Sequence, residues 1–139
     1  KQISLCQKNK MQLSEIEIEK HSPLLHAKAG NCLAQKKYGI TDEEILLAIS
    51  YHTTGRPRMS LLEKIIYIAD YIEPGRERAK RSYADIQNLA LVRKMAYRDL
   101  DETLCKILSD TLDYLSRKGG KIDSMTRETY EYYCHIHET

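Results

Sequence analysis

Two histidines and one aspartate stand out in this sequence as residues that could bind a metal ion. His26 lies about one turn into an expected helix, and His52 lies at the expected end of the next one. Asp70 interrupts an apolar helical stretch, Ile65–Ile72, where a carboxylate is costly unless a cation or a metal neutralises it. Imidazole and carboxylate together suit iron, zinc or manganese. We therefore treat all three residues as candidate ligands of a divalent metal.

Each of these residues also has a purely structural interpretation. His26 could be a half-buried side chain that bonds a backbone carbonyl. His52 could stabilise the C-terminus of its helix, where a positive charge is favourable. Asp70 could form an ion pair with an arginine or a lysine. Convergence of the three side chains on one site would separate the metal hypothesis from these alternatives.

Basic residues flank the candidate ligands along the chain. They are Arg56, Arg58, Lys64 and Arg76. Arginine beside a metal indicates an anionic substrate such as a phosphate, although basic residues in loops are usually just solvated. The loop at Gly55 also precedes a capped helix, whose first N–H groups can bind phosphate oxygens.

The elements that must position these residues are expected to be helices. Apolar residues recur at three- and four-residue steps, which predicts an all-α fold of antiparallel helices joined by short loops. The expected helices run from Ser22–Pro23 to Gly39, from Thr41 or Asp42 to His52, from Ser60 to Pro74, from Ser82 through Met95, from Leu100 to Gly119, and from Thr126 through Tyr133. For the first twenty residues the alternatives are a loop, a short helix, or a strand around Ile16–Glu19.

The composition limits the function classes. The 139 residues predict one domain, and 22 basic against 20 acidic residues give no support for nucleic-acid binding. Four cysteines without a C-x-x-C pair indicate a reducing, cytoplasmic compartment, and no apolar run has membrane-spanning length. Ten tyrosines replace phenylalanine and tryptophan altogether, so buried hydroxyls will need hydrogen-bond partners.

Three ordered motifs resemble a bacterial branch of the HD-domain metal-dependent phosphohydrolases, the symmetrical diadenosine tetraphosphate hydrolases. They are His26–Gly30, Tyr51–Pro57 and Ile68–Arg76. The resemblance implies an HD-domain-like helical bundle with a dinuclear metal centre, with iron favoured and manganese, zinc or magnesium as alternatives. It implies metal ligands at His26, His52 and Asp70, catalytic roles for Asp70, His52 and Arg56, and a substrate-binding set of Thr54, Gly55, Arg56 and Arg76. Glu63 or Glu73 would orient the histidines.

One part of the family pattern has no counterpart here. The family places a first histidine and a His-Asp doublet on earlier helices, and this sequence contains no such doublet. The resemblance therefore implies a bundle truncated at its N-terminus. The domain prediction is a connecting segment at 1–20, a partial HD-type domain at 21–134 and a tail at 135–139. An apolar face would remain for the earlier helices or for a second copy, which makes a homodimer one expectation.

The function that the resemblance implies is metal-dependent hydrolysis of a nucleotide phosphoanhydride, with symmetrical cleavage of diadenosine tetraphosphate to two ADP. The expected partner is a nucleotide or dinucleoside polyphosphate substrate, with no nucleic acid and no membrane. One alternative is an HD phosphohydrolase that acts on another nucleotide. A second alternative is a non-catalytic helical binding module, because half of the family's metal site is missing from the sequence.

Overall fold

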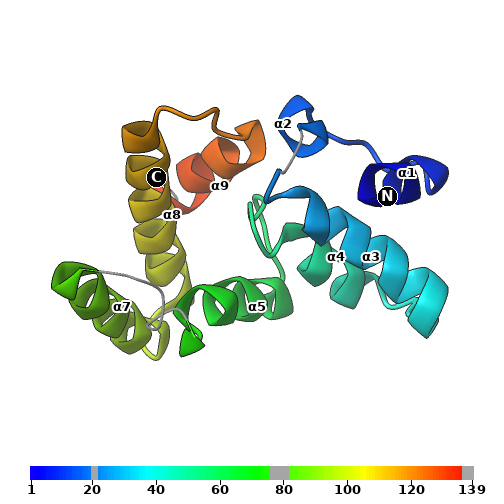
Figure 1. Ribbon diagram of the computed structural model, residues 1–139. Helices are drawn as coiled ribbons and strands as arrows, with labels where there is room; N and C mark the ends of the chain where they lie inside the picture. Colours follow the sequence, from blue (N-terminus) through cyan, green and yellow to red (C-terminus); the bar gives the residue numbers. More distant parts are fainter. Residues whose placement is uncertain (20–21, 76–81, 136–139) are drawn as a thin grey trace.

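The computed structural model describes residues 1–19, 22–75 and 82–135, and all the regular structure within these ranges is helical (Figure 1). The helices are α1 (Gln2–Lys8), α2 (Glu15–Ile18), α3 (Leu25–Tyr38), α4 (Glu43–Tyr51), α5 (Leu61–Ile72), α7 (Tyr83–Ala96), α8 (Leu100–Lys118) and α9 (Ser124–His135). This confirms the all-α prediction. In Figure 1, α5 lies between α3 and α4 on one side and α7, α8 and α9 on the other.

Most helix ends lie where local capping signals place them. Ser60 and Glu63 form a capping box at the start of α5, and Asp42 caps α4 by accepting from the Ile45 N–H. Gly39 and Gly119 end α3 and α8 in the left-handed conformation that glycine adopts at little cost. These predictions from sequence are confirmed.

Two helix starts differ from the prediction. The helix α3 begins at Leu25, because the Ser22 hydroxyl accepts from the Leu24 N–H at 3.3 Å and forms a turn before the helix instead of capping it. The helix α9 begins at Ser124, because the Asp123 carboxylate accepts from the Met125 N–H at 2.9 Å and so supplies a cap before Thr126 is reached.

The first twenty residues, for which the sequence left a loop, a short helix or a strand open, contain the helices α1 and α2. Ile16, Glu17 and Ile18 lie in α2, so the stretch does not form a strand. The helix α1 packs against α3 through a small core cluster of Cys6, Leu25, Ala29 and Cys32. The larger core cluster joins α5, α7, α8 and α9, and its members are Met59, Tyr67, Ile68, Val92, Leu104, Ile107, Leu108 and Tyr133.

The cysteines do not all remain free. Cys105 of α8 and Cys134 of α9 form a disulfide, whereas Cys6 and Cys32 are free and buried. The pair differs from the reduced state expected for a reducing compartment, and its 29-residue separation left no motif to read in the sequence. Within the described ranges, no helix combines the length and the apolar character needed to cross a membrane.

Candidate metal site

His26 and His52 meet, although they are 26 residues apart and lie on different helices. His26 is in the first turn of α3, and His52 is the C-terminal cap of α4. Their Nε2 atoms are 2.9 Å apart, and their ring centroids are 4.9 Å apart at an interplanar angle of 62°. His26 is exposed and His52 is half-buried, so solvent reaches the pair.

Backbone carbonyls fix the orientation of both imidazole rings. The Nδ1 atom of His26 lies 2.6 Å from the Pro23 carbonyl oxygen, and Nδ1 of His52 lies 2.6 Å from the Ile49 carbonyl oxygen. A carbonyl can only accept, so each Nδ1 carries a hydrogen, and a ring that carries no second hydrogen has its lone pair on Nε2. These carbonyls take the orienting role that the sequence analysis gave to Glu63 or Glu73. In both cases the carbonyl belongs to the residue three positions before the histidine. This spacing is the sequence signal that could have identified the two carbonyls.

This donor set fits a divalent cation. Two Nε2 lone pairs that face each other repel unless a positive charge lies between or beside them. Two nitrogens bound to one six-coordinate ion at right angles, with bonds of about 2.1 Å, lie about 3 Å apart. The observed separation of 2.9 Å matches that arrangement.

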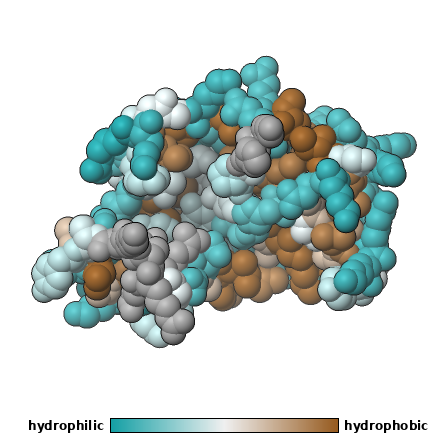
Figure 2. Space-filling model, in the orientation of Figure 1, coloured by the Kyte–Doolittle hydropathy of each residue, from teal (hydrophilic) through white to brown (hydrophobic). Residues whose placement is uncertain are grey.

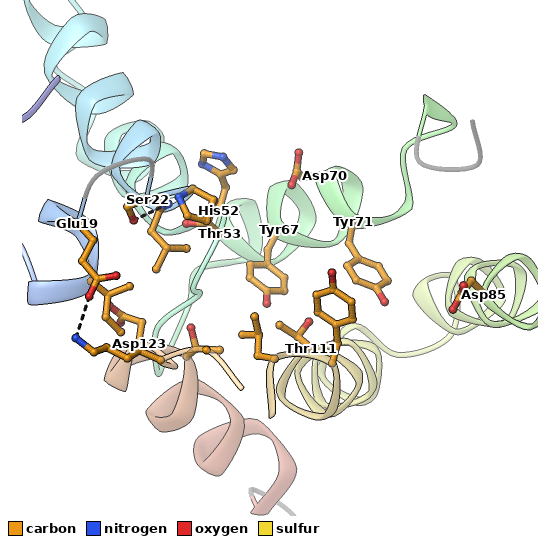
Figure 3. A pocket seen from close by; sticks show the side chains of 18 of the residues that line it. Glu19, Ser22, His52, Thr53, Tyr67, Asp70, Tyr71, Asp85, Thr111 and Asp123 are labelled. Carbon is orange, nitrogen blue, oxygen red and sulfur yellow. Dashed lines mark hydrogen bonds and ion pairs between the residues drawn. The ribbon is translucent and has the colours of Figure 1, made fainter. Parts of the chain in front are cut away.

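Asp70 lies near the histidine pair but does not complete a ligand group with it. Asp70 and His52 line the same cavity, which has a volume of about 840 Å³ (Figure 3). Asp70 comes from α5, His52 caps the end of α4, and Thr53 lies in the turn that follows. Among the described residues, no set of three His, Cys, Asp or Glu side chains is arranged to hold a metal ion. The structure thus brings together two of the three expected ligands.

The cavity is large and its wall is rich in tyrosine. Tyr67 and Tyr71 of α5 and Tyr114 of α8 line it together with the acidic residues Asp85 and Asp123 (Figure 3). Burial, more than the charges of Tyr71 and Asp70, raises the pKa of Tyr67 well above its ordinary value, so its hydroxyl stays protonated. The cavity therefore offers aromatic surface and hydroxyl groups beside His52.

The surface of α5 remains apolar where none of the described helices covers it. Leu61, Ile65 and Ile66 are 63%, 45% and 39% exposed, and Ile45 of α4 is 40% exposed. Figure 2 shows hydrophobic residues gathered over α5 and the neighbouring part of α4. An apolar face of this kind was expected from the missing part of the family pattern.

Arg56 is engaged in a buried ion pair. Its Nε and Nη2 atoms donate to the two carboxylate oxygens of Glu63 at 2.6 and 2.9 Å. Burial favours the neutral form of Glu63, but the hydrogen bonds from Arg56 and from the Ser60 N–H outweigh it and hold the pKa of this carboxyl below its ordinary value. The hydrogen bond to Glu63 likewise raises the pKa of Arg56. This structural role was missed, although the sequence showed Glu63 as a capping-box residue.

The other expected substrate-binding residues are only partly accessible. Thr54 is buried, and its hydroxyl donates to the Gly55 carbonyl at 2.9 Å. Gly55 is also buried and has a φ of 66°. Arg76 lies outside the described residues.

Comparisons with known proteins give close relatives, although no family model matches the chain. The chain is 42% identical over 113 residues to the symmetrical bis(5'-nucleosyl)-tetraphosphatase of Bacillus subtilis, a match that covers 81% of the chain and 56% of the relative. It is 43% identical over 107 residues to the protein of that name in Halalkalibacterium halodurans, covering 77% of the chain and 53% of the relative. The chain thus spans little more than half the length of these relatives.

A solved structure shares the fold over almost the whole chain. It is the crystal structure of a protein from Clostridium acetobutylicum described as a predicted HD superfamily hydrolase involved in NAD metabolism. The two are 42% identical and superpose with a TM-score of 0.84, over 97% of this chain and 67% of that one.

Proposed function

Since the chain belongs to the HD superfamily of hydrolases, we propose that it serves in the metal-dependent hydrolysis of nucleotide phosphoanhydrides. The proposed substrate is diadenosine tetraphosphate, cleaved symmetrically to two ADP, because two close relatives are named for symmetrical tetraphosphatase activity. The chain covers only part of those relatives, so reaction and substrate are both proposals for it. We propose no nucleic-acid or membrane partner, and a homodimer through the apolar face of α5 stays a prediction.

The observation that supports this proposal is the orientation of the histidine pair. In both rings the Nδ1–H group donates to a backbone carbonyl. The two Nε2 atoms face each other at a distance of 2.9 Å. A histidine that only capped a helix or filled a core position would have no need to meet a second one in this way. The arrangement is the one that metal-ligating histidines adopt when carbonyls fix their tautomer.

In this mechanism the Nε2 atoms of His26 and His52 would hold one divalent cation, and the Asp70 carboxylate would hold the other ion of the dinuclear centre. A bound cation of this kind lowers the pKa of a water molecule and polarises the attacked phosphoryl group. The Pro23 and Ile49 carbonyls keep both rings in the ligating tautomer. Iron is the proposed metal, with manganese, zinc or magnesium as alternatives and a second ion in the complete family site.

The polyphosphate is proposed to lie along the loop that follows His52, beside Thr54, Gly55, Arg56 and Arg76. The pair with Glu63 uses Nε and Nη2 of Arg56, which leaves the Nη1 side of the guanidinium for a phosphate oxygen. We propose that the hydrolase part comprises residues 21–134, preceded by a connecting segment at 1–20 and followed by a tail at 135–139.

Metal binding to the 139-residue chain tests the ligand set. We expect Mn²⁺, followed by its electron paramagnetic resonance signal, to bind the chain, and His26→Ala or His52→Ala to weaken binding at least tenfold. Asp70→Asn should weaken it as well. His135→Ala is the matched control, because this histidine lies at the far end of α9. Unchanged Mn²⁺ affinity after both histidine substitutions would remove them from the site.

The reaction is tested with diadenosine tetraphosphate and either Fe²⁺ or Mn²⁺, using the gene product that contains this chain. Chromatography should show ADP as the sole nucleotide product, and His52→Ala should abolish turnover. A mixture of AMP and ATP would contradict symmetrical cleavage. Turnover of other nucleotides alone would support a different HD phosphohydrolase.

One observation favours a second function, a non-catalytic helical binding module. In the described part of the chain the histidine pair has no third side chain arranged with it as a metal ligand. A binding module would show weak metal affinity that the histidine substitutions do not change, together with no hydrolysis. The metal titration therefore separates the two functions.

A further inference from the structure

The helix α9 contacts the loop that carries His52. We call residues 52–60 the His52 loop; it joins α4 to α5. Near its end, the Met59 N–H donates to the Tyr133 hydroxyl of α9 at 2.8 Å, across 74 residues of sequence. Met59 and Tyr133 are both buried, at 5% and 2% exposure. Burial raises the pKa of Tyr133 to about 12, so the hydroxyl remains protonated at neutral pH.

A second contact lies one turn earlier on α9. Thr129 is fully buried, and a Cβ atom placed on Gly55 would lie only 2.7 Å from the Thr129 Cγ2 atom. The backbone of the His52 loop therefore approaches α9 as closely as a residue without a side chain permits. The Gly55 N–H in turn donates to the Tyr51 carbonyl at 2.8 Å, which ties this contact to the turn that contains His52.

A covalent bond fixes the end of α9 that makes these contacts. Cys134 directly follows Tyr133 and is bonded to Cys105 of α8. Both cysteines are half-buried, so a small reductant can reach them. Leu104 and Leu108, on either side of Cys105, are fully buried in the core and hold α8 in place.

We propose that α9 positions the His52 loop through Tyr133 and Thr129, and that the Cys105–Cys134 disulfide holds α9 there, so that reduction loosens the loop. The disulfide is thus a redox-sensitive control on the histidine pair. Its consequence for metal binding rests on the proposed function, whereas the loosening of the loop does not.

The chemical step is thiol–disulfide exchange with a dithiol such as dithiothreitol. A thiolate of the reductant attacks one sulfur, the Cys105–Cys134 bond breaks, and a mixed disulfide forms. The second thiol of the reductant then displaces the protein sulfur. Two electrons and two protons pass to Cys105 and Cys134, which become thiols, and the reductant becomes a cyclic disulfide.

Hydrogen exchange followed by mass spectrometry tests the proposal on the 139-residue chain. We expect peptides that cover residues 53–60 to exchange at least tenfold faster after reduction, because the Met59 amide loses its fixed acceptor. Peptides from α3, which contains the free Cys32, should not change and serve as the internal control. Equal exchange of residues 53–60 before and after reduction would overturn the proposal.

Variants separate the disulfide from the hydroxyl contact. The double variant Cys105→Ser, Cys134→Ser should exchange as fast as the reduced protein and show no response to dithiothreitol. Tyr133→Phe keeps the ring and the disulfide but removes the acceptor, so Met59 should exchange fast even in the oxidised chain. A wild-type rate at Met59 in Tyr133→Phe would exclude α9 as the positioning element.

The link to the metal site has its own readout. Reduction of the wild-type chain should weaken Mn²⁺ binding at least threefold, and the double cysteine variant should bind equally under both conditions. A loosened loop with unchanged Mn²⁺ affinity would overturn the link to the histidine pair. Absence of Mn²⁺ binding in both states would instead contradict the proposed function, while the exchange result would still test the role of α9.

Discussion

Glu63 illustrates how a single buried charge can organise the segment around it. Its carboxylate accepts from Arg56 Nε, Arg56 Nη2 and the Ser60 N–H, at 2.6, 2.9 and 2.7 Å. The Glu63 side chain is 1% exposed, and that of Arg56 is 28% exposed. One residue therefore caps α5 and also fixes the arginine of the His52 loop.

Removal of one partner of this pair should cost more than removal of both. We expect Arg56→Met to lower the free energy of unfolding by about 3 kcal/mol, because it leaves a buried carboxylate without its counter-charge. Urea denaturation at pH 7 measures the change. The double variant Arg56→Met, Glu63→Met should recover most of the loss. Equal stability of the single and double variants would contradict the buried-pair description.

The same pair predicts a dependence on pH. The folded-state pKa of Glu63 is held below its unfolded value of about 4.3, so the stabilisation is present above that pH. It is lost as the pH falls through the lower folded-state pKa. As the pH falls from 5 to below the folded-state pKa of Glu63, the free energy of unfolding should therefore decrease more in the wild-type chain than in the double variant Arg56→Met, Glu63→Met. Urea denaturation at several pH values measures this difference.

The helices of this protein are limited by local signals that act within one turn. The N-caps of α5 and α7 are serines. Each serine hydroxyl accepts a hydrogen bond from the backbone N–H three residues later, which is that of Glu63 in α5 and that of Asp85 in α7. The C-terminal ends of α3 and α8 are glycines with φ of 66° and 69°. These local signals fix where α5 and α7 begin and where α3 and α8 end.

Gly119 and Gly120 provide a matched test of the helix end. Both positions have open space around an added Cβ, but only Gly119 has a positive φ, of 69°. We expect Gly119→Ala to lower the free energy of unfolding by about 1 kcal/mol, because an alanine is strained in the left-handed region. Gly120→Ala should change it by much less. Equal losses in chemical denaturation would show that backbone strain does not set this helix end.

At the scale of the molecule, the larger core cluster joins the C-terminal helices to α5. Ile107 and Leu108 of α8 are fully buried in it, and Tyr67 and Tyr133 supply its rings. This confirms the expectation that tyrosine replaces the missing phenylalanine and tryptophan. The core and the cavity share part of α5, because Tyr67 belongs to the larger core cluster and also lines the cavity beside His52.

Two leucine substitutions test how much the larger core cluster contributes to the free energy of unfolding. Leu108→Ala should lower the free energy of unfolding by about 3 kcal/mol, because it leaves a cavity in a fully buried position. Leu91→Ala on α7 is the control, since Leu91 is 48% exposed and its loss should cost less than about 1 kcal/mol. Thermal or urea denaturation compares the two. Similar decreases in the free energy of unfolding for the two variants would show that Leu108 does not lie in the main core.

The sequence by itself determined most of the helices after residue 20 and most of their limits, because capping boxes, glycine ends and apolar spacing act between residues at most four apart. It also singled out His26, His52 and Asp70 by residue type and motif. Only the tertiary structure decided that the two histidines face each other, that Arg56 is bound to Glu63, and that Cys105 joins Cys134. These contacts depend on how helices cross and on which residues lie in the turns between them. The interactions that set helix crossings are distributed over the whole core, so no short stretch of sequence records them.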